Sequence, residues 1–500
     1  MTSPDSPSTE SPVSFEAWLD TSGVTRAMWL LWVLSAGLIA LDGFDFFIIG
    51  VALPFLKRDF SLSSAEVGAV AVAAVAGSLI GSLTLGPITD RVGRQRMLIA
   101  DVALFILATA GTTFAWNAPS LIAFRFLVGI GIGADYPISV AYITENVPSR
   151  LRGRMVIGAF TFQAVGALLG ALTGVVVIHL FQMLYPDSTQ PAIQYAWRWM
   201  LGVGLMLAIA VGIIRFNFLL ESPRYYIAKG NYDAASKAAS LLLETSIMIT
   251  PETDPPAREP NLSYGALFSP QFRRNTLFAS LPWFLQDIAT YGIGIFTPTI
   301  IEALAFASEP DLLTREIASA RSSALVDVFL IAGFLIAIWL IEWVGRVRLQ
   351  VVGFLGMAAG LGILAVCDRL PTQTNATLIW VFIGFFIFNL MMNAGPNSTT
   401  FLLSGEVFPT SIRASGAGFA AAFAKVGAVL GTFALPVLKQ SWGVSTLLWV
   451  LALCCALAAM ITYGLRVETT GRSLEAVTCN GHSENEASEP AEQLQHARPQ

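Results

Sequence analysis

Charged residues are scarce in this chain, and their scarcity excludes most soluble proteins. Asp, Glu, Lys and Arg make up only 13% of its 500 residues, while 55% are hydrophobic. A globular chain carries about 25% charged residues. A soluble surface built from so few charges would leave large apolar patches. The same composition excludes a chain that is mainly disordered.

Histidine and cysteine are also rare. The sequence has three His and four Cys, and two of the His lie in the polar C-terminal tail. The Cys lack the spacing of a metal site or of a disulfide framework. We therefore predict no metal site and no cofactor. The net charge of −5 gives no electrostatic reason to expect nucleic acid as a partner. What remains is a polytopic membrane protein in a lipid bilayer.

Twelve long apolar stretches run along the chain. A transmembrane helix needs about 20 mostly apolar residues. Stretches of this kind lie near residues 27–50, 65–87, 97–116, 119–145, 155–182, 197–220, 279–305, 322–343, 350–368, 376–404, 414–438 and 444–466. The longest polar interruption, residues 222–276, separates six predicted spans from six.

Arginines gather in alternate loops between these spans. The loop after span 2 holds Arg91, Arg94 and Arg96, and the loop after span 4 holds three more. Lys57 and Arg58, after span 1, are the exception. The positive-inside rule places the Arg-rich loops and both termini in the cytoplasm. We expect an integral protein of the plasma (inner) membrane.

The two halves of the chain repeat each other. Residues 90–96 (DRVGRQR) follow span 2, and residues 342–348 (EWVGRVR) follow span 8, 252 positions later. Glu145 and Arg152 likewise correspond to Glu406 and Arg413, 261 positions later. Either loop alone could be a simple Arg-rich anchor, but two matching loops favour a duplication. Duplicated halves place a substrate site between them, near the middle of the bilayer.

We therefore predict an all-α polytopic membrane protein whose twelve transmembrane helices form two pseudo-symmetric six-helix bundles. The bundles cover residues 25–221 and 277–466. A cytoplasmic linker covers residues 222–276. Disordered cytoplasmic tails cover residues 1–24 and 467–500.

This pattern resembles the major facilitator superfamily over nearly the whole chain. The similarity lies in residues 86–96 (GPITDRVGRQR) and 125–131 (RFLVGIG), and residues 221–224 (ESPR) and 470–475 (TGRSLE) resemble its sugar-porter-like branch. The resemblance implies two bundles that rock about a central site. It also implies a cytoplasmic latch between them. The corresponding residues here are Asp90, Arg91, Arg94, Glu145, Arg152, Glu342, Arg346, Glu406 and Arg413.

Four acids lie well inside predicted spans: Asp42, Asp45, Asp135 and Asp287. Each ionisable residue at a helix centre costs about 2.5–3.5 kcal/mol, so the four cost on the order of 10 kcal/mol together. A structural role could explain one or two of them, but four indicate function. A carboxyl that takes up a proton on one side and releases it on the other would couple transport to protons.

Two basic residues, Arg125 and Lys425, lie comparably deep in the predicted spans. Spans 1 and 4 both line the centre of such a bundle, so we predict that Asp45 pairs with Arg125. The alternative is that Arg125 extends to the outer surface. We assign proton coupling to Asp45, Arg125 and Asp42.

Hydrogen-bond donors accompany these charges. Trp283, Asp287 and Tyr291 recur every four residues and share one helix face. Asn393 and Asn397 flank a Gly-Pro break. A Lys ammonium among amide, phenol and indole donors suits an oxyanion. Ordinary helix packing could also explain the Trp-Tyr face.

A narrower resemblance is to the phosphate:proton symporter family. It lies in residues 131–137 (GIGADYP), the Trp283-Asp287-Tyr291 face, residues 395–401 (GPNSTTF) and residues 405–410 (GEVFPT). The resemblance implies that a phosphate site is formed by Asp135, Tyr136, Gln163, Trp283, Asp287, Tyr291, Asn397 and Lys425. It also associates Asp45 with proton transfer.

The sequence thus predicts a monomeric, proton-coupled transporter of a small anion, inorganic phosphate first, and no enzyme. The first alternative is a proton symporter of an organic acid or a sugar. A second is a receptor without transport activity on the same scaffold. The hypothesis of an enzyme would depend on Gly129, Gly131 and Gly133, whose spacing is similar to that of a nucleotide-binding loop. These glycines lie inside an apolar span and not in such a loop.

Overall fold

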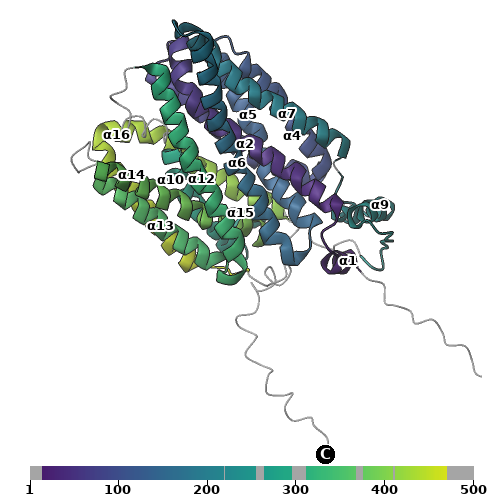
Figure 1. Ribbon diagram of the computed structural model, residues 1–500. Helices are drawn as coiled ribbons and strands as arrows, with labels where there is room; N and C mark the ends of the chain where they lie inside the picture. Colours follow the sequence, from purple (N-terminus) through teal and green to yellow (C-terminus); the bar gives the residue numbers. More distant parts are fainter. Residues whose placement is uncertain are drawn as a thin grey trace, which may run out of the picture.

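The computed structural model describes residues 14–218, 220–254, 264–294, 311–367, 375–408 and 412–469. Within these ranges every regular element is a helix. Figure 1 shows the long helices in two groups, the N-terminal half in purple to teal and the C-terminal half in green to yellow.

The N-terminal half contains six long helices. They are α2 (Arg26–Asp59), α3 (Ser64–Val92), α4 (Arg94–Thr113), α5 (Ala118–Asn146), α6 (Arg152–Leu184) and α7 (Trp197–Phe218). A capping box of Ser63 and Glu66 begins α3, and Asn117 with Ser120 begins α5. Gly93, at φ 107°, lets the chain turn sharply between α3 and α4.

The C-terminal half repeats this arrangement. It contains α10 (Arg273–Gly294), α12 (Leu312–Val344), α13 (Arg346–Cys367), α14 (Asn375–Ala394), α15 (Pro396–Glu406) and α16 (Arg413–Leu465). Gly345, at φ 87°, takes the place of Gly93. The helices α14 and α15 are one predicted span interrupted at Gly395, and α16 joins the last two predicted spans around a non-helical Gly443.

Eleven helical segments in the described part are long and apolar enough to cross a membrane. The remaining predicted span, 279–305, begins in α10, which is described only to Gly294. Gln286, Asp287 and Thr290 make α10 less apolar than the other spans. These three polar side chains belong to the candidate functional site.

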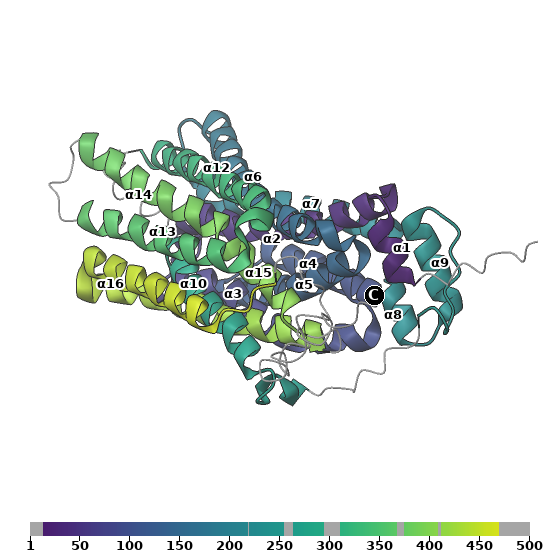
Figure 2. The same cartoon turned by 90° about the horizontal axis from the view of Figure 1, so that it is seen from below.

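Small residues allow the long helices to approach closely. A Cβ added to Gly77 on α3 would lie 2.0 Å from the Phe126 carbonyl oxygen of α5, and one added to Gly129 on α5 would lie 2.0 Å from the Ala74 oxygen. Helices in lipid rely on such backbone contact to pack. Between the halves, α6 packs on α12 and α3 packs on α16, and Figure 2 shows the two groups side by side.

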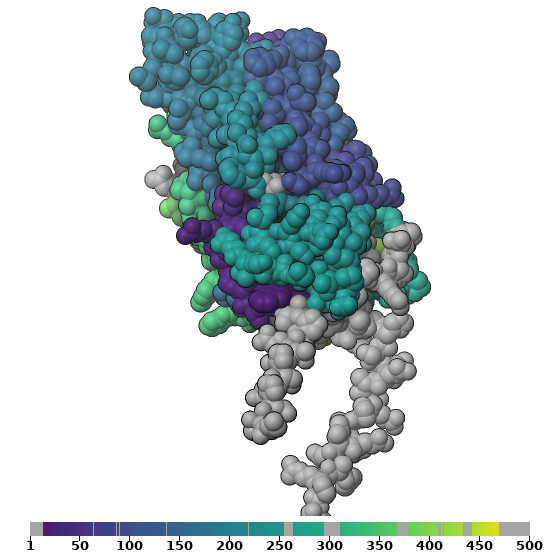
Figure 3. Space-filling view, turned by 90° about the vertical axis from the view of Figure 1, so that its right-hand side faces the viewer, coloured from purple at the N-terminus to yellow at the C-terminus, as the bar shows by residue number. Residues whose placement is uncertain are grey.

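Three short helices cover one end of the N-terminal half: α1 (Phe15–Thr21), α8 (Pro223–Ala228) and α9 (Tyr232–Leu243). We call this end of the molecule the α9 end. The helix α2 starts at this end: the backbone N–H of Ala27, in its first turn, donates to Glu244 just after α9 at 3.1 Å. Figure 3 shows the purple N-terminal segment lying against the teal residues of this region.

The helix α1 lies inside residues 1–24, which we predicted to be a disordered tail. Phe15 and Leu19 are buried in one apolar cluster with Leu242 and Leu243. The Phe15 backbone N–H also donates to the Asp254 carboxylate at 3.0 Å. Two apolar side chains one helical turn apart therefore order the end of this tail. The predicted tail residues 1–13 and 470–500 lie outside the described residues.

The close approach of α3 and α5 gives a test of the packing. Gly77→Val should destabilise the protein by about 3 kcal/mol, because the new side chain must push the α5 backbone away. Gly68→Val is the matched control on the same helix, since no atom lies within 4 Å of a Cβ at Gly68. Thermal unfolding of the purified protein in detergent should separate the two variants. Equal melting temperatures would contradict this packing.

Candidate functional site: a polar cavity between the halves

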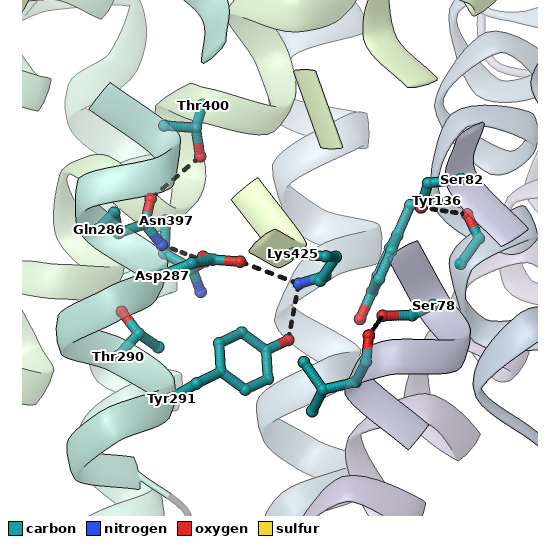
Figure 4. Close-up of polar contacts among 12 residues, drawn as sticks. Ser78, Ser82, Tyr136, Gln286, Asp287, Thr290, Tyr291, Asn397, Thr400 and Lys425 are labelled. Carbon is teal, nitrogen blue, oxygen red and sulfur yellow. Dashed lines mark hydrogen bonds and ion pairs between the residues drawn. The ribbon is translucent and has the colours of Figure 1, made fainter. Parts of the chain in front are cut away.

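Lys425 lies at the centre of the molecule, in contact with two residues of α10. Its Nζ is 3.1 Å from Asp287 Oδ2 and donates to the Tyr291 hydroxyl at 2.8 Å. Lys425 and Asp287 are each 2% exposed. The ammonium also lies 4.4 Å from the centroid of the Tyr291 ring and 5.5 Å from that of Tyr136. Figure 4 shows Lys425 between the α10 residues and Tyr136.

A chain of amides lies beside this group. Gln286 donates to Asn397 at 3.0 Å, Asn397 donates to Asn393 at 2.7 Å, and Asn393 donates to the Leu330 carbonyl at 3.0 Å. The break at Gly395 puts Asn393 and Asn397 on two separate helices that face the same space. Gln286 was missed in the sequence, because only the four-residue spacing of Trp283, Asp287 and Tyr291 was followed.

The N-terminal half contributes Tyr136 from α5 and Gln163 from α6. The Gln163 amide donates to the Tyr136 hydroxyl at 2.8 Å. This bond orients the amide beside the position of Lys425, across the boundary between the halves.

These groups surround a cavity of about 660 Å³, including its open mouth. Of the eight predicted substrate residues, five line it. They are Gln163, Asp287, Tyr291, Asn397 and Lys425. The rest of the wall is largely apolar, with Phe46, Phe47, Leu330, Phe334 and Phe401. One ammonium and several N–H or O–H groups therefore face a space that apolar side chains enclose.

Aromatic rings close this cavity toward the α9 end. Phe401 stacks on Phe160 with centroids 4.0 Å apart, and Trp283 and Tyr136 lie 4.7 and 5.5 Å from it. Trp283 and Tyr136, both predicted substrate residues, therefore contribute to the closing layer, which we call the ring layer. Two of its rings come from each half.

Asp45 and Arg125 form a second buried group. Arg125 Nη1 donates to Asp45 Oδ2 at 2.5 Å, and Arg125 is fully buried. The predicted pairing of these two residues is confirmed. The alternative, in which Arg125 extends to the surface, is excluded by its burial.

Asp135 does not line the cavity, although we predicted it among the substrate residues. Its Oδ1 accepts from Ser139 at 2.9 Å and lies 3.7 Å from Arg215 Nη2. Arg215 is fully buried in α7, and its guanidinium also donates to the Leu34 carbonyl at 3.0 and 3.1 Å. The expectation that Arg125 and Lys425 are the deep basic residues was therefore incomplete. Arg215 was missed because it lies near the end of its predicted span.

Two further carboxyls complete this third group, the acid cluster of Asp42, Asp101, Asp135 and Arg215. Asp42 interacts electrostatically with both other acids, with Asp45 and with Arg215. Asp101 faces α5, since a Cβ on Gly131 would lie 3.2 Å from its Oδ1. Both oxygens of Asp42 and of Asp101 are buried and lack a hydrogen-bond partner among the described residues. Three buried acids thus share one guanidinium.

The predicted latch residues lie at the α9 end, in two matching sets. In the first, Arg94 pairs with Glu145 at 2.9 Å, and Glu221 accepts the backbone N–H groups of Arg94 and Gln95, each at 3.1 Å. Burial raises the pKa of the Glu221 carboxyl, while the backbone N–H groups of Ser222, Gln95 and Arg94 act in the opposite direction.

In the second set, Arg346 pairs with Glu342 at 2.9 Å and with Glu406 at 3.5 Å. Glu468 accepts the backbone N–H groups of Arg346 and Val347, each at 3.3 Å. Glu468 therefore plays the part of Glu221 in the C-terminal half. The sequence repeat did not reveal it.

The halves meet at these sets. A Cβ on Gly153 of α6 would lie 2.9 Å from Glu342 Oε1 of α12, and Arg152 and Glu406 attract each other across the boundary. Arg413 donates to the Phe408 carbonyl of its own half at 3.3 Å. Arg91 is exposed, and its carbonyl accepts from the Tyr225 hydroxyl at 3.3 Å. The side chain of Asp90 lies outside the described residues.

Comparisons with known proteins agree with this architecture. Residues 30–480 match the family described as "Sugar (and other) transporter". The inorganic phosphate transporter 1-6 of Oryza sativa subsp. japonica is 30% identical over 499 residues, which cover 90% of this chain and 92% of the relative. The putative metabolite transport protein YaaU of Escherichia coli (strain K12) is 27% identical over 445 residues, with 89% and 93% covered.

Solved structures show the same fold. The major facilitator superfamily proton:xylose symporter XylE bound to 6-bromo-6-deoxy-D-glucose superposes with a TM-score of 0.75 at 19% identity, covering 91% of this chain and 99% of that one. The inward open conformation of XylE from E. coli gives a TM-score of 0.63 at 19% identity, with 90% and 99% covered.

Two helical halves around one central cavity have the major facilitator fold, and the family match makes the protein a membrane transporter and not an enzyme. The predicted fold of twelve transmembrane helices is confirmed. The chain belongs to the sugar (and other) transporter family, and it is an integral membrane protein with a small-molecule substrate.

The acid cluster gives a stability test. Arg215→Met should destabilise the protein by about 3–5 kcal/mol at neutral pH, because three buried acids lose their shared cation. Arg224→Met is the control, since the Arg224–Glu16 pair at 3.1 Å is more exposed and such pairs contribute about 0–1 kcal/mol. Thermal unfolding in detergent measures both. A loss for Arg215→Met no larger than the control's would contradict the cluster.

Proposed function

We propose that the protein is a proton-coupled symporter of inorganic phosphate that works by alternating access. The observation that carries the proposal is the buried ammonium of Lys425 at the cavity, with the Tyr291 hydroxyl and the Gln163 and Asn397 amides around the same space. A cation and neutral donors in an apolar enclosure suit an oxyanion. The rice relative named above, an inorganic phosphate transporter, supports phosphate as that oxyanion.

Lys425 and Asp287 would exchange partners during binding. In the structure, Asp287 neutralises the ammonium at 3.1 Å. An incoming phosphate would take over the Lys425 contact, and Asp287 would then carry a proton and donate to a phosphate oxygen. If Asp287 later loses that proton, its charge repels the anion and favours release.

The acid cluster and the Asp45–Arg125 pair would form the proton path. Asp45 lies one helical turn from Asp42 toward the end opposite α9. A buried carboxylate without hydrogen bonds is costly, and a bound proton lowers that cost by removing the charge. A proton taken up near Asp45 would pass to Asp42 and then to Asp101 or Asp135. Arg215 would hold Asp135 at the inner end of the path.

We infer that the α9 end is cytoplasmic, as the Arg-rich loops of the positive-inside rule favour. The cavity is closed at that end by the ring layer and by the latch sets. The conformation described here would then face outward. One chain supplies both halves of the cavity, which supports a monomer, and plasma-membrane location remains our proposal.

The decisive experiment is uptake of labelled phosphate by proteoliposomes under an imposed pH gradient, acid outside. We expect accumulation against the phosphate gradient, and no competition from benzoate or hexoses. Lys425→Ala should weaken phosphate binding roughly 10- to 100-fold, the value of a hydrogen bond to a charged group. Lys57→Ala, at an exposed helix end, should change nothing. If benzoate or a hexose inhibits the uptake of labelled phosphate more strongly than unlabelled phosphate does, that compound and not phosphate is the substrate.

Proton coupling is tested in the acid cluster. Asp135→Asn should abolish accumulation while phosphate exchange across the membrane continues, because the substrate cavity does not include Asp135. Asp187→Asn, in an exposed loop, is the matched control and should accumulate phosphate normally. Uphill uptake at the normal level by Asp135→Asn would remove this residue from the proton path.

A further inference from the structure

Asp327 of α12 is a buried carboxyl that the mechanism above does not use. It is 4% exposed, and no described residue gives it a hydrogen bond or an ion pair. It lines a second cavity, of about 510 Å³ including open space, together with Ser323 and Asn389. Asp327 lies within the predicted span 322–343, near its start.

The second cavity adjoins the first on the side away from the α9 end. Both are lined by Phe47, Thr290, Leu330 and Met392. The second adds Val51 of α2, one turn beyond Phe47 toward the opposite end. Asp327 therefore lines a cavity next to the one that Lys425 lines, on the side away from the α9 end.

The surroundings of Asp327 favour a proton as its ligand and not a metal ion. The neighbouring hydroxyls donate elsewhere and give Asp327 no hydrogen bond, since Ser323 donates to the Ser319 carbonyl at 3.1 Å and Thr290 donates to Met392 Sδ at 3.0 Å. Asn389 donates to the Phe385 carbonyl at 2.9 Å. A hard cation prefers six or more oxygen ligands, and this largely apolar wall offers few.

The charged and titratable groups facing this region are few. Asp287 and Tyr291 approach from α10 and Lys425 from α16, and Lys425 is already paired with Asp287. On α12 itself, Arg321 lies six residues away with an exposed side chain, and Glu316 lies three turns away toward the opposite end. The cavity walls from α2, α6 and α14 are uncharged: Phe47, Val51, Ala171, Asn389 and Met392. No cation on these walls offsets a charge on Asp327.

We propose that Asp327 is a proton-binding carboxyl on the anion's entry route and acts as an electrostatic filter there. When ionised, it repels an anion before the anion reaches Lys425. When it has taken a proton from water at the cavity mouth, it lets the anion pass. The inference rests on the proposed function, and it adds a pH-dependent affinity that is separate from proton coupling.

The test is the apparent KM for labelled phosphate in proteoliposomes at several external pH values, from acid to mildly alkaline. For the wild type we expect the KM to rise with pH more than the change in phosphate ionisation requires. Asp327→Asn should lower the KM at the alkaline end roughly tenfold, the effect of one like charge about 10 Å away at an effective dielectric constant of about 20. The maximal rate and accumulation against a gradient should persist.

Asp327→Glu is the matched variant that keeps the titrating group, and it should keep the pH dependence. If Asp327→Asn does not fold, Asp327→Leu takes its place, because it also removes the charge. KM–pH profiles that coincide for the wild type and the neutral variant would overturn the proposal. Loss of accumulation in the neutral variant would also overturn it, since Asp327 would then belong to the coupling path.

The failure of the proposed function would look different. If wild-type proteoliposomes take up another anion and not phosphate, the phosphate assignment fails. The same KM–pH comparison with that anion then still decides the role of Asp327.

Discussion

The structure depends on one constraint: a charge buried in a membrane protein must be neutralised, either by a proton or by a partner of opposite charge on another helix. Lys425 of α16 meets Asp287 of α10, Arg125 of α5 meets Asp45 of α2, and Arg215 of α7 meets Asp135 of α5. Each pair ties two helices together deep in the interior. Removing one partner of a buried pair costs several kcal/mol. A ligand that displaces a partner therefore changes the relative free energies of the conformations of the whole bundle.

The halves share a scaffold but divide the chemistry between them. The turn glycines and the latch sets occur in both, at Gly93 and Gly345, and around Arg94 and Arg346. The acid cluster lies in the N-terminal half, whereas the ammonium lies in the C-terminal half. The duplicated bundles thus share their turn glycines and latch sets but differ in the charged residues of their interiors. In the proposed mechanism, this division lets protons and substrate follow parallel routes.

The sequence predicted the fold because spans, loops and repeat all carry strong composition signals. It also predicted the Asp45–Arg125 pair and brought Lys425 and Asp287 into one site, since so few charges are available in the spans. It predicted Asp135 in that lining, whereas Asp135 lies beside Arg215, and it missed Arg215 and Asp101, because both missed residues lie near the ends of their predicted spans. In a uniformly apolar helix, the neighbouring helices decide which residues face the cavity and which face another helix. A single sequence does not contain this information.

The ring layer is part of the interface between the N-terminal and C-terminal halves, each of which would move as a rigid body. Phe401 belongs to the C-terminal half, whereas Phe160 and Tyr136 belong to the N-terminal half. Parting the halves would separate these rings without refolding any helix. The two ring pairs that bridge the seam are worth about 1–3 kcal/mol together beyond their buried area. Such a join is weak enough to open and close repeatedly, since neutralising a single buried charge releases a comparable free energy.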